Sequence, residues 1–143
     1  MKHTINQNKR IIICDPIYDF IDLSHYTFII KLIDTPFFQR LRRLSQLGVS
    51  VFVYPSAAHN RFNHSVGAME LFIRLFDHLY KKKIHKHDRL RKIGVASVLL
   101  HDIGHGPFSH TTESIFSFNH EALSRKIVEN EMADILTHCD KNM

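Results

Sequence analysis

The sequence of 143 residues has no tryptophan, only two cysteines and only five glycines. Cys14 and Cys139 stand near opposite ends of the chain without CxxC spacing, which argues against a disulfide scaffold and against a zinc site built on thiolates. Uninterrupted apolar runs, such as residues 11–14, are far shorter than the ~20 residues that a membrane helix needs. We therefore expect reduced thiols and no membrane span.

The N-terminus also lacks a targeting signal. Residues 1–10 are polar and basic, with no apolar segment behind them, so no secretory signal is recognised and a cytoplasmic location is predicted. The content of 44% apolar and 23% charged residues is typical of a soluble globular protein. The length suits a single domain over residues 1–143.

The charge is moderately basic. Lysine and arginine number 19 against 14 acidic residues, which gives +5 and suits an anionic partner such as a nucleotide, a nucleic acid or an acidic lipid. A basic stretch occupies residues 81–92. The more unusual count is 12 histidines, and because histidine supplies metal ligands and proton carriers at neutral pH, the function is expected to lie among them.

The hydrophobic pattern predicts a mostly helical chain. Residues 11–13 favour a short strand that enters a turn, and residues 49–54 alternate like a strand or hairpin arm. Thr35 followed by Pro36 is typical of a helix start. Helices are expected over residues 24–32, 35–47, 59–80, 89–102 and onward from a cap at Asn119. The predicted fold is an all-α helical bundle with a short β-hairpin near the N-terminal third.

The His101-Asp102 pair follows the most apolar predicted helix. Burying a carboxylate without a counter-charge costs several kcal/mol, roughly, and a divalent metal ion is a usual way to remove that cost. A third ligand would come from His64 or His59, at the start of an upstream helix. A His-Asp pair standing alone is more often a hydrogen-bonded cap than a ligand set.

Further histidines favour a metal ligand set over a hydrogen-bonded cap at the His101-Asp102 pair. His105, His110 and His120 lie in or near the glycine-rich turn that follows Asp102. Several histidines around one buried carboxylate are a less plausible chance arrangement, so a metal site is favoured over a simple hydrogen-bonded cap.

Several ordered motifs carry a resemblance. They lie at residues 34–42, 46–48, 59–65 and 101–110. Together they resemble the HD superfamily of metal-dependent phosphohydrolases, and within it the deoxynucleoside triphosphate triphosphohydrolase branch, which includes the SAM-and-HD-domain enzymes and bacterial dGTPases. The resemblance spans roughly residues 11–124.

The resemblance implies an all-helical HD fold and a set of site residues. The implied metal ligands are His64, His101 and Asp102, with a further Asp from a later helix, around a divalent ion (Mn, Fe, Zn, Mg or Ni). The implied nucleotide contacts are Gln46, Leu47 and Arg61. The implied catalytic residues are His105 and His110 along the triphosphate, and Glu113, which stands where the family usually has an Asp that pairs with a catalytic His, here His120.

The chain departs from the family pattern in two ways. Asp134 and Asp140 are the only aspartates after Asp102, and both come sooner than the family's spacing suggests. The chain also stops at Met143, whereas enzymes of this branch continue through many more helices that complete the pocket and the oligomer, so an N-terminal piece of such an enzyme is expected. The domain is therefore expected to be incomplete at its C-terminus, to bind a divalent ion weakly, to hydrolyse deoxynucleoside triphosphates slowly or not measurably, and to self-associate. The motif of Asp34, Gln39 and Arg42 contributes to a regulatory nucleotide site in the larger enzymes, but helix capping is the favoured interpretation here.

Three functions are carried forward. The leading one is hydrolysis of a (deoxy)nucleoside triphosphate to nucleoside and triphosphate. The second is another HD-type reaction, a nucleotide phosphohydrolase or phosphodiesterase, because a metal set alone does not choose the bond. The third is a non-catalytic fragment that binds a nucleotide or nucleic acid through the basic stretch. The expected partners are a nucleotide substrate and a second copy of the chain, with no membrane.

Overall fold

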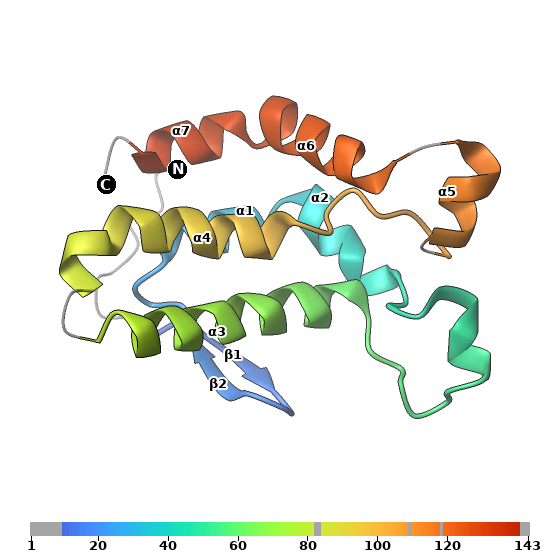
Figure 1. Ribbon diagram of the computed structural model, residues 1–143, viewed down its shortest axis with the longest axis horizontal. Helices are drawn as coiled ribbons and strands as arrows, with labels where there is room; N and C mark the ends of the chain where they lie inside the picture. Colours follow the sequence, from blue (N-terminus) through green and yellow to red (C-terminus); the bar gives the residue numbers. More distant parts are fainter. Residues whose placement is uncertain (1–9, 82–83, 109, 118, 141–143) are drawn as a thin grey trace.

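The computed structural model describes residues 10–81, 84–108, 110–117 and 119–140. Within these ranges it is mostly helical with one antiparallel hairpin (Figure 1), as predicted. The strands and α-helices are β1 Ile12–Asp15, β2 Asp19–Asp22, α1 Thr27–Ile33, α2 Pro36–Gln39, α3 Arg61–Leu79, α4 Asp88–Leu100, α5 His110–Phe116, α6 His120–Glu131 and α7 Ala133–Asp140. Short 3-10 helices cover Arg40–Arg43, Gly48–Phe52 and Ile84–His87.

The hairpin consists of β1 and β2, and only one of the two segments that were predicted as strands takes part in it. Residues 11–13 were expected to form a strand, and β1 covers most of them, but the predicted strand over residues 49–54 is wrong, because Gly48–Phe52 is a 3-10 helix. Its residues Val49 and Phe52 are exposed. An alternating pattern specifies a strand only where one face is buried, and neither face is buried here.

Two predicted helices start or end elsewhere. Ser24 does not cap α1; its hydroxyl accepts a hydrogen bond from the Ile11 amide, at 3.1 Å, and α1 begins at Thr27. Thr35 caps α2 as predicted, accepting from the Phe38 amide. The helix does not continue to residue 47, because Leu44 is extended and its carbonyl accepts a hydrogen bond from the Arg61 amide. Pairing with a distant segment here overrides local helix preference.

The C-terminal helix is divided. Asn119 caps α6 by accepting from the Ala122 amide, as predicted, but the helix ends at Met132 and α7 follows. Met132 is fully buried. The short helix α5 was not predicted.

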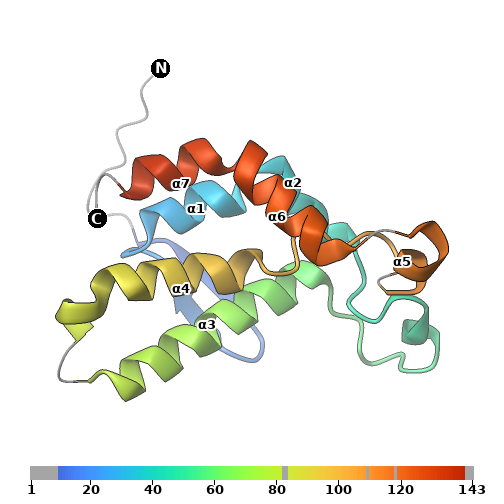
Figure 2. The ribbon, with the colours of Figure 1, turned by 45° about the horizontal axis from the view of Figure 1, so that its top comes forward.

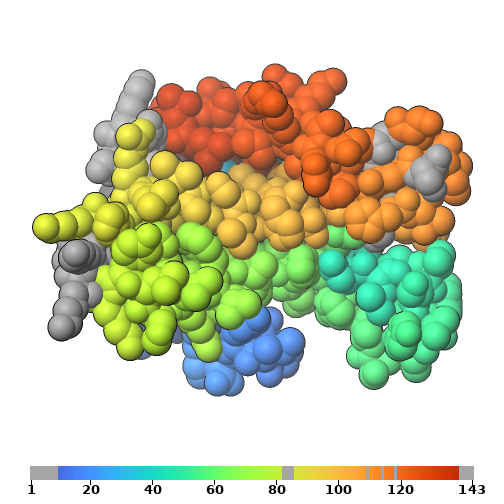
Figure 3. Space-filling view, viewed as in Figure 1, coloured from blue at the N-terminus to red at the C-terminus, as the bar shows by residue number. Residues whose placement is uncertain are grey.

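The core lies between a helix pair and a covering layer. Helices α3 and α4 pack side by side and run antiparallel, while α1, α6 and α7 lie over α4 (Figures 1 and 2). The hairpin and the segment near residues 48–58 protrude on the side of α3 away from α6 and α7 (Figure 3). Fully buried side chains include those of Ile29, Leu32, Phe38, Leu41, Met69, Val95, Leu99, Ile103 and Met132.

This arrangement gathers the polar residues of interest at one end. The start of α3, the end of α4 and the segment from α5 to the start of α6 all meet there (Figure 1). Among the described residues, no helix is long and apolar enough to cross a membrane.

Candidate metal centre

The start of α3 presents His64 in the first turn of the helix. Asn60 and Asn63 form a reciprocal cap, in which each side chain accepts a hydrogen bond from the other's amide, at 3.0 and 3.4 Å. Such a cap satisfies amides that the first turn leaves unpaired. The antiparallel helix α4 ends at Leu100, so His101 and Asp102 come to lie opposite this first turn.

The three side chains converge as predicted. The Nε2 atoms of His64 and His101 are 3.3 Å apart. Nε2 of His101 is 3.3 Å from Oδ1 of Asp102, and Nε2 of His64 is 3.6 Å from Oδ2. Asp102 is buried, while both imidazoles are partly open to solvent.

The tautomer of His101 is fixed by its neighbour. Its Nδ1 lies 2.7 Å from the Val98 carbonyl oxygen, which can only accept, so Nδ1 carries the proton and Nε2 of the neutral ring carries the lone pair. Burial lowers the pKa of His64, outweighing the opposite effect of Asp102. The neutral imidazole, the form that binds metals, is therefore favoured at His64.

The donor set fits a divalent metal ion. Ligands about 2.0–2.1 Å from a tetrahedral or octahedral ion stand roughly 2.9–3.4 Å apart, close to the separations of 3.3, 3.3 and 3.6 Å observed here. Two imidazoles and one carboxylate leave positions open for water and substrate. In the described part of the chain, no fourth histidine, cysteine or acidic residue joins this group. Asp134, one of the two aspartates that follow Asp102 in the sequence, lies in the first turn of α7 and is not part of the group.

Asp102 is contacted by Arg61 and His105 on its inner side. The Arg61 guanidinium donates a 2.6 Å hydrogen bond to Oδ2, and Nε2 of His105 lies 3.5 Å from Oδ1. Burial alone raises the pKa of Asp102, but the hydrogen bond from His105 and the charges of His101, His105 and Arg61 lower it far below its ordinary value. Asp102 is therefore ionised at any pH at which the chain would be studied.

A second cluster lies directly behind the first. His105, His110, Glu113 and His120 offer ligand atoms that all lie within 4.8 Å of one another. Oε1 of Glu113 is 3.3 Å from Nδ1 of His105, 3.3 Å from Nδ1 of His110 and 2.9 Å from Nδ1 of His120. The hydrogen bond from His120 lowers the pKa of Glu113. The predicted pairing of Glu113 with His120 is thus present.

Two residues that sequence reasoning did not single out, Arg40 and Ser124, position these clusters. Arg40 donates hydrogen bonds to the carbonyl oxygens of Ile103 and His105. The hydroxyl of Ser124 accepts from the Gly104 amide at 2.8 Å and donates to the His101 carbonyl at 3.1 Å. These bonds fasten the 101–105 turn to the 3-10 helix Arg40–Arg43 and to α6.

Gly104 permits the close contact with α6. A Cβ atom at this position would stand 2.2 Å from the His120 carbonyl oxygen, far inside van der Waals contact. The start of α6 therefore reaches the turn only because residue 104 has no side chain. The glycine-rich turn after Asp102 was visible in the sequence, but the close approach of α6 that requires a glycine at residue 104 was not.

The predicted nucleotide-contacting residues divide into two groups. Gln46 and Leu47 follow the Ser45–Asn60 bridge beside the start of α3, and both are partly exposed. Arg61 is 2% exposed and its guanidinium points to Asp102. In the regulatory motif, Gln39 binds the Ile33 carbonyl and Arg42, consistent with the favoured capping interpretation.

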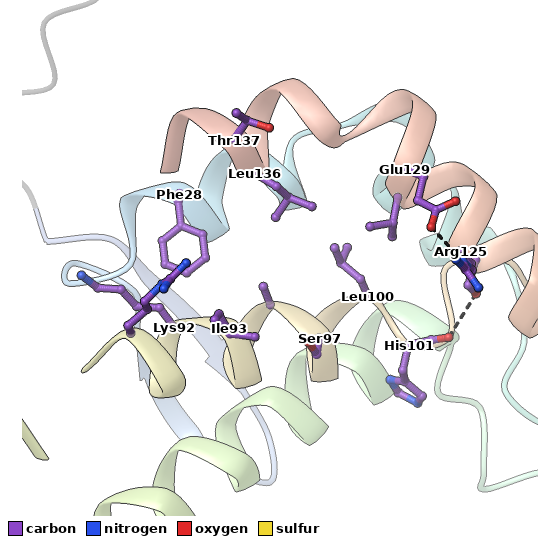
Figure 4. Close-up of a pocket in the computed structure, with 14 residues that line it drawn as sticks. Phe28, Lys92, Ile93, Ser97, Leu100, His101, Arg125, Glu129, Leu136 and Thr137 are labelled. Carbon is purple, nitrogen blue, oxygen red and sulfur yellow. Dashed lines mark hydrogen bonds and ion pairs between the residues drawn. The ribbon is translucent and has the colours of Figure 1, made fainter. Parts of the chain in front are cut away.

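A cavity lies elsewhere in the fold. It has a volume of about 610 Å³ and lies between α1, α4, α6 and α7, with largely apolar walls that include Phe28, Leu100 and Leu136 (Figure 4). His101 stands at its end with the imidazole directed away from the cavity (Figure 4). The His101 imidazole therefore does not enter this cavity, although the residue lines it.

Comparison with known proteins identifies the family. The model of the HD domain matches residues 61–138, which includes every histidine and carboxylate of the two clusters. The chain belongs to the HD domain family. The match begins at Arg61, the first residue of α3, and ends at His138, within α7.

Curated HD domain relatives are similar over most of this chain. The uncharacterized protein YwfO of Bacillus subtilis is 41% identical over 80% of this chain and 26% of its own length. Deoxynucleoside triphosphate triphosphohydrolase SAMHD1 of Homo sapiens is 41% identical over 73% of this chain and 17% of its own. The chain thus spans about a sixth to a quarter of the length of these relatives.

Solved structures show the same fold. A phosphohydrolase from Bacteroides thetaiotaomicron superposes with a TM-score of 0.80 and 38% identity, over 90% of this chain and 33% of that one. A hypothetical protein from Aquifex aeolicus superposes with a TM-score of 0.75 and 34% identity, over 91% and 34%.

Proposed function

We propose that this HD domain is the metal-binding core of a phosphohydrolase that converts a (deoxy)nucleoside triphosphate to nucleoside and triphosphate. The observation that carries the proposal is the convergence of His64, His101 and Asp102 beside the second cluster, with His105 lying between Asp102 and Glu113. The choice of substrate rests on the similarity to the SAMHD1 proteins, which are named as deoxynucleoside triphosphate triphosphohydrolases.

In this reaction, the oxygen of a water molecule bonds to the α-phosphorus and the bond to the 5′ oxygen of the nucleoside breaks. The water loses a proton, and the leaving 5′ oxygen gains one. A divalent ion at His64, His101 and Asp102 would polarise the phosphate and activate the water.

The second cluster supplies groups for the proton transfers. His110 is exposed and can reach a ligand at the surface, so we assign it to protonate the leaving oxygen. Glu113 contacts Nδ1 of His120 at 2.9–3.0 Å, which fixes the ring and raises its basicity. Loss of such a proton-transfer group costs about 10²- to 10⁴-fold in rate.

Product analysis tests the proposal. The purified chain is incubated with each deoxynucleoside triphosphate and Mn²⁺ in ¹⁸O-water, and the products are separated and weighed by mass spectrometry. Nucleoside together with ¹⁸O-labelled triphosphate is expected. The His101→Ala and His110→Ala variants should lose this product, while His25→Ala, which changes an exposed histidine outside both clusters, should keep it.

Other products would reject this assignment. Nucleoside monophosphate with diphosphate, or hydrolysis of a cyclic nucleotide or phosphomonoester alone, would favour the second function carried forward above. Nucleotide binding that needs no metal and weakens steeply with salt, without any product, would favour a binding fragment.

A further inference from the structure

The cavity between α1, α4, α6 and α7 lies apart from the imidazoles and carboxylates of both clusters (Figure 4). We propose that it binds the hydrocarbon chain of a free long-chain fatty acid, with the carboxylate beside Arg89 and Lys92 at the start of α4. The inference goes beyond the proposed hydrolysis and does not depend on it, because no metal-binding side chain has to take part.

The dimensions of the cavity exclude a helix as its occupant. Along α4 the cavity is lined at every third or fourth position from Arg89 through Ala96 to Leu100, which is about 16 Å at a rise of 1.5 Å per residue. A volume of about 610 Å³ over that length gives a cross-section of roughly 40 Å². An α-helix with its side chains is about 10–12 Å wide and fills about 80–110 Å², so it is too wide for this cavity.

A single hydrocarbon chain fits the same dimensions. Carbon atoms pack about 3.5–4.0 Å apart, so one chain occupies roughly 20 Å² in cross-section and leaves room to bend. With carbon–carbon bonds of about 1.5 Å, an extended chain advances roughly 1.3 Å per carbon, so about 12–14 carbons span the cavity. The cavity therefore suits a fatty acid and not a short organic acid.

The walls suit an apolar ligand. Phe28 of α1, Val128 of α6 and Leu136 of α7 all line the cavity, and all three are only partly buried against the core. Covering such side chains with hydrocarbon is favourable roughly in proportion to the apolar area removed from water. The hydroxyl of Ser124 also lines the cavity, but it is engaged in the two hydrogen bonds that fasten the 101–105 turn, so it is not available to a polar ligand such as a nucleotide.

The charges around the cavity favour an anionic head group. The basic lining residues are Arg89, Lys92 and Arg125, and the acidic one is Glu129. Arg125 pairs with Glu129 at 2.8 Å, at the end of the cavity away from Lys92 (Figure 4), so the excess positive charge lies at the start of α4. Lys92 pairs with Asp88 at 2.7 Å one helical turn away. Such partly exposed pairs contribute little, so the ammonium group can also bind a carboxylate.

The cavity is accessible from solvent and separate from the metal-binding atoms. Ile93 is 47% exposed, and Ser97 and Thr137, which also line the cavity, are exposed as well. The imidazole of His101 is directed away from the cavity (Figure 4). A fatty acid and a divalent ion therefore do not compete for the same atoms.

Equilibrium dialysis tests the proposal. The metal-free 143-residue chain is dialysed against radiolabelled tetradecanoate below its critical micelle concentration, and one equivalent is expected to bind. Shortening the fatty acid by two carbons should weaken binding roughly tenfold, because each buried methylene contributes to the affinity. Tetradecanol, which has the same chain without the charge, should bind more weakly than tetradecanoate.

Variants locate the bound chain and its head group. Ser97→Phe adds a ring to the cavity wall and should weaken binding by at least about tenfold, whereas Leu75→Phe adds bulk at an exposed position of α3 outside the cavity and should change nothing. Lys92→Glu should weaken the binding of tetradecanoate several-fold and leave that of tetradecanol unchanged. Lys81→Glu, which reverses an exposed charge outside the cavity, should affect neither ligand.

A second wall variant keeps the test independent of how Ser97→Phe folds. Ile93 is partly exposed, so Ile93→Glu should fold, as circular dichroism can establish, and its charge should repel the carboxylate. The proposal is refuted if wild type does not bind tetradecanoate, or if Ser97→Phe and Ile93→Glu bind it as tightly as wild type does.

Two other occupants give different results. If the chain binds phosphatidylglycerol vesicles but not monomeric tetradecanoate, the cavity takes a membrane lipid and the proposal fails. If wild type is a dimer by sedimentation, Ser97→Phe makes it a monomer and tetradecanoate does not bind, the cavity belongs to a second copy of the chain, which also overturns the proposal.

One variant separates this inference from the proposed function. His64→Ala should bind tetradecanoate as wild type does, although it removes a metal ligand and should form no nucleoside. If wild type forms nucleoside but binds no tetradecanoate, the hydrolase assignment stands and the fatty acid site is refuted. If it binds tetradecanoate but forms no nucleoside, the reverse holds.

Discussion

Replacing Arg61 tests how strongly its ion pair with the buried Asp102 carboxylate stabilises the folded chain. Its guanidinium is 2% exposed and donates a 2.6 Å hydrogen bond to Asp102, which is itself buried. Replacing Arg61 with alanine leaves a buried carboxylate without its nearest cation. Removing one partner of a buried ion pair costs about 3–5 kcal/mol, because the other charge stays behind. We expect the free energy of unfolding to fall by about that amount, and the midpoint temperature to fall by roughly 10 °C.

The matched control lies on the same helix. Arg74 also pairs with a carboxylate, Glu70, at 2.7 Å, but its side chain is about half exposed. Exposed pairs contribute about 0.2–1 kcal/mol, so Arg74→Ala should cost several times less than Arg61→Ala. Both values come from urea unfolding of the metal-free protein, followed by circular dichroism.

Two further measurements decide whether the unpaired charge of Asp102 causes the loss of stability in Arg61→Ala. Adding Asp102→Asn to Arg61→Ala removes the unpaired carboxylate, so the double variant should be more stable than Arg61→Ala alone. Mn²⁺ at about 100 times its dissociation constant should return up to ~2.7 kcal/mol, since the ion supplies the missing positive charge. The reasoning is refuted if Arg61→Ala is within about 0.5 kcal/mol of wild type, or if Asp102→Asn lowers its stability further.

Three other predictions follow from the surroundings of this centre. The pKa of Asp102 is lowered in the folded chain, so the unfolded chain takes up more protons at low pH. Stability should therefore fall as the pH drops below about 5, and this slope, measured by urea unfolding between about pH 3 and 7, should be shallower in Asp102→Asn. Gly104→Ala should destabilise the chain by at least about 2 kcal/mol and reduce Zn²⁺ binding, because a Cβ atom would collide with the His120 carbonyl; unchanged thermal unfolding would contradict this. Ser124→Ala removes the hydrogen bonds to Gly104 and His101 and should cost about 1–3 kcal/mol by calorimetry, whereas Ser97→Ala, on the cavity wall, should cost less than half as much.

The sequence was sufficient to predict the elements whose signals are local. The caps at Thr35 and Asn119 and the long helix after Asn60 follow from short-range chemistry, and the structure confirms them. The predicted helix over residues 35–47 is wrong beyond residue 43, because the Leu44 carbonyl pairs with the Arg61 amide. Nothing in the local pattern encodes that long-range contact.

The same distinction applies to the site. His101 and Asp102 were identified because a polar pair ends an apolar helix, and the convergence with His64 follows from two helices that pack antiparallel. The roles of Arg40 and Ser124 could not be predicted in this way. Arg40 reaches carbonyl oxygens more than sixty positions away, and Ser124 joins α6 to the turn through one hydroxyl.

His105 connects the two clusters. Its ring is 2% exposed and lies between Asp102 and Glu113, with Nε2 3.5 Å from the first carboxylate and Nδ1 3.3 Å from the second. A neutral imidazole has one N–H and one lone pair, so the ring can donate a hydrogen bond to only one of these two carboxylates. When Asp102 receives that hydrogen bond, the lone pair of Nδ1 faces Glu113. We therefore expect a substitution at Glu113 to alter metal binding at Asp102 through this single imidazole.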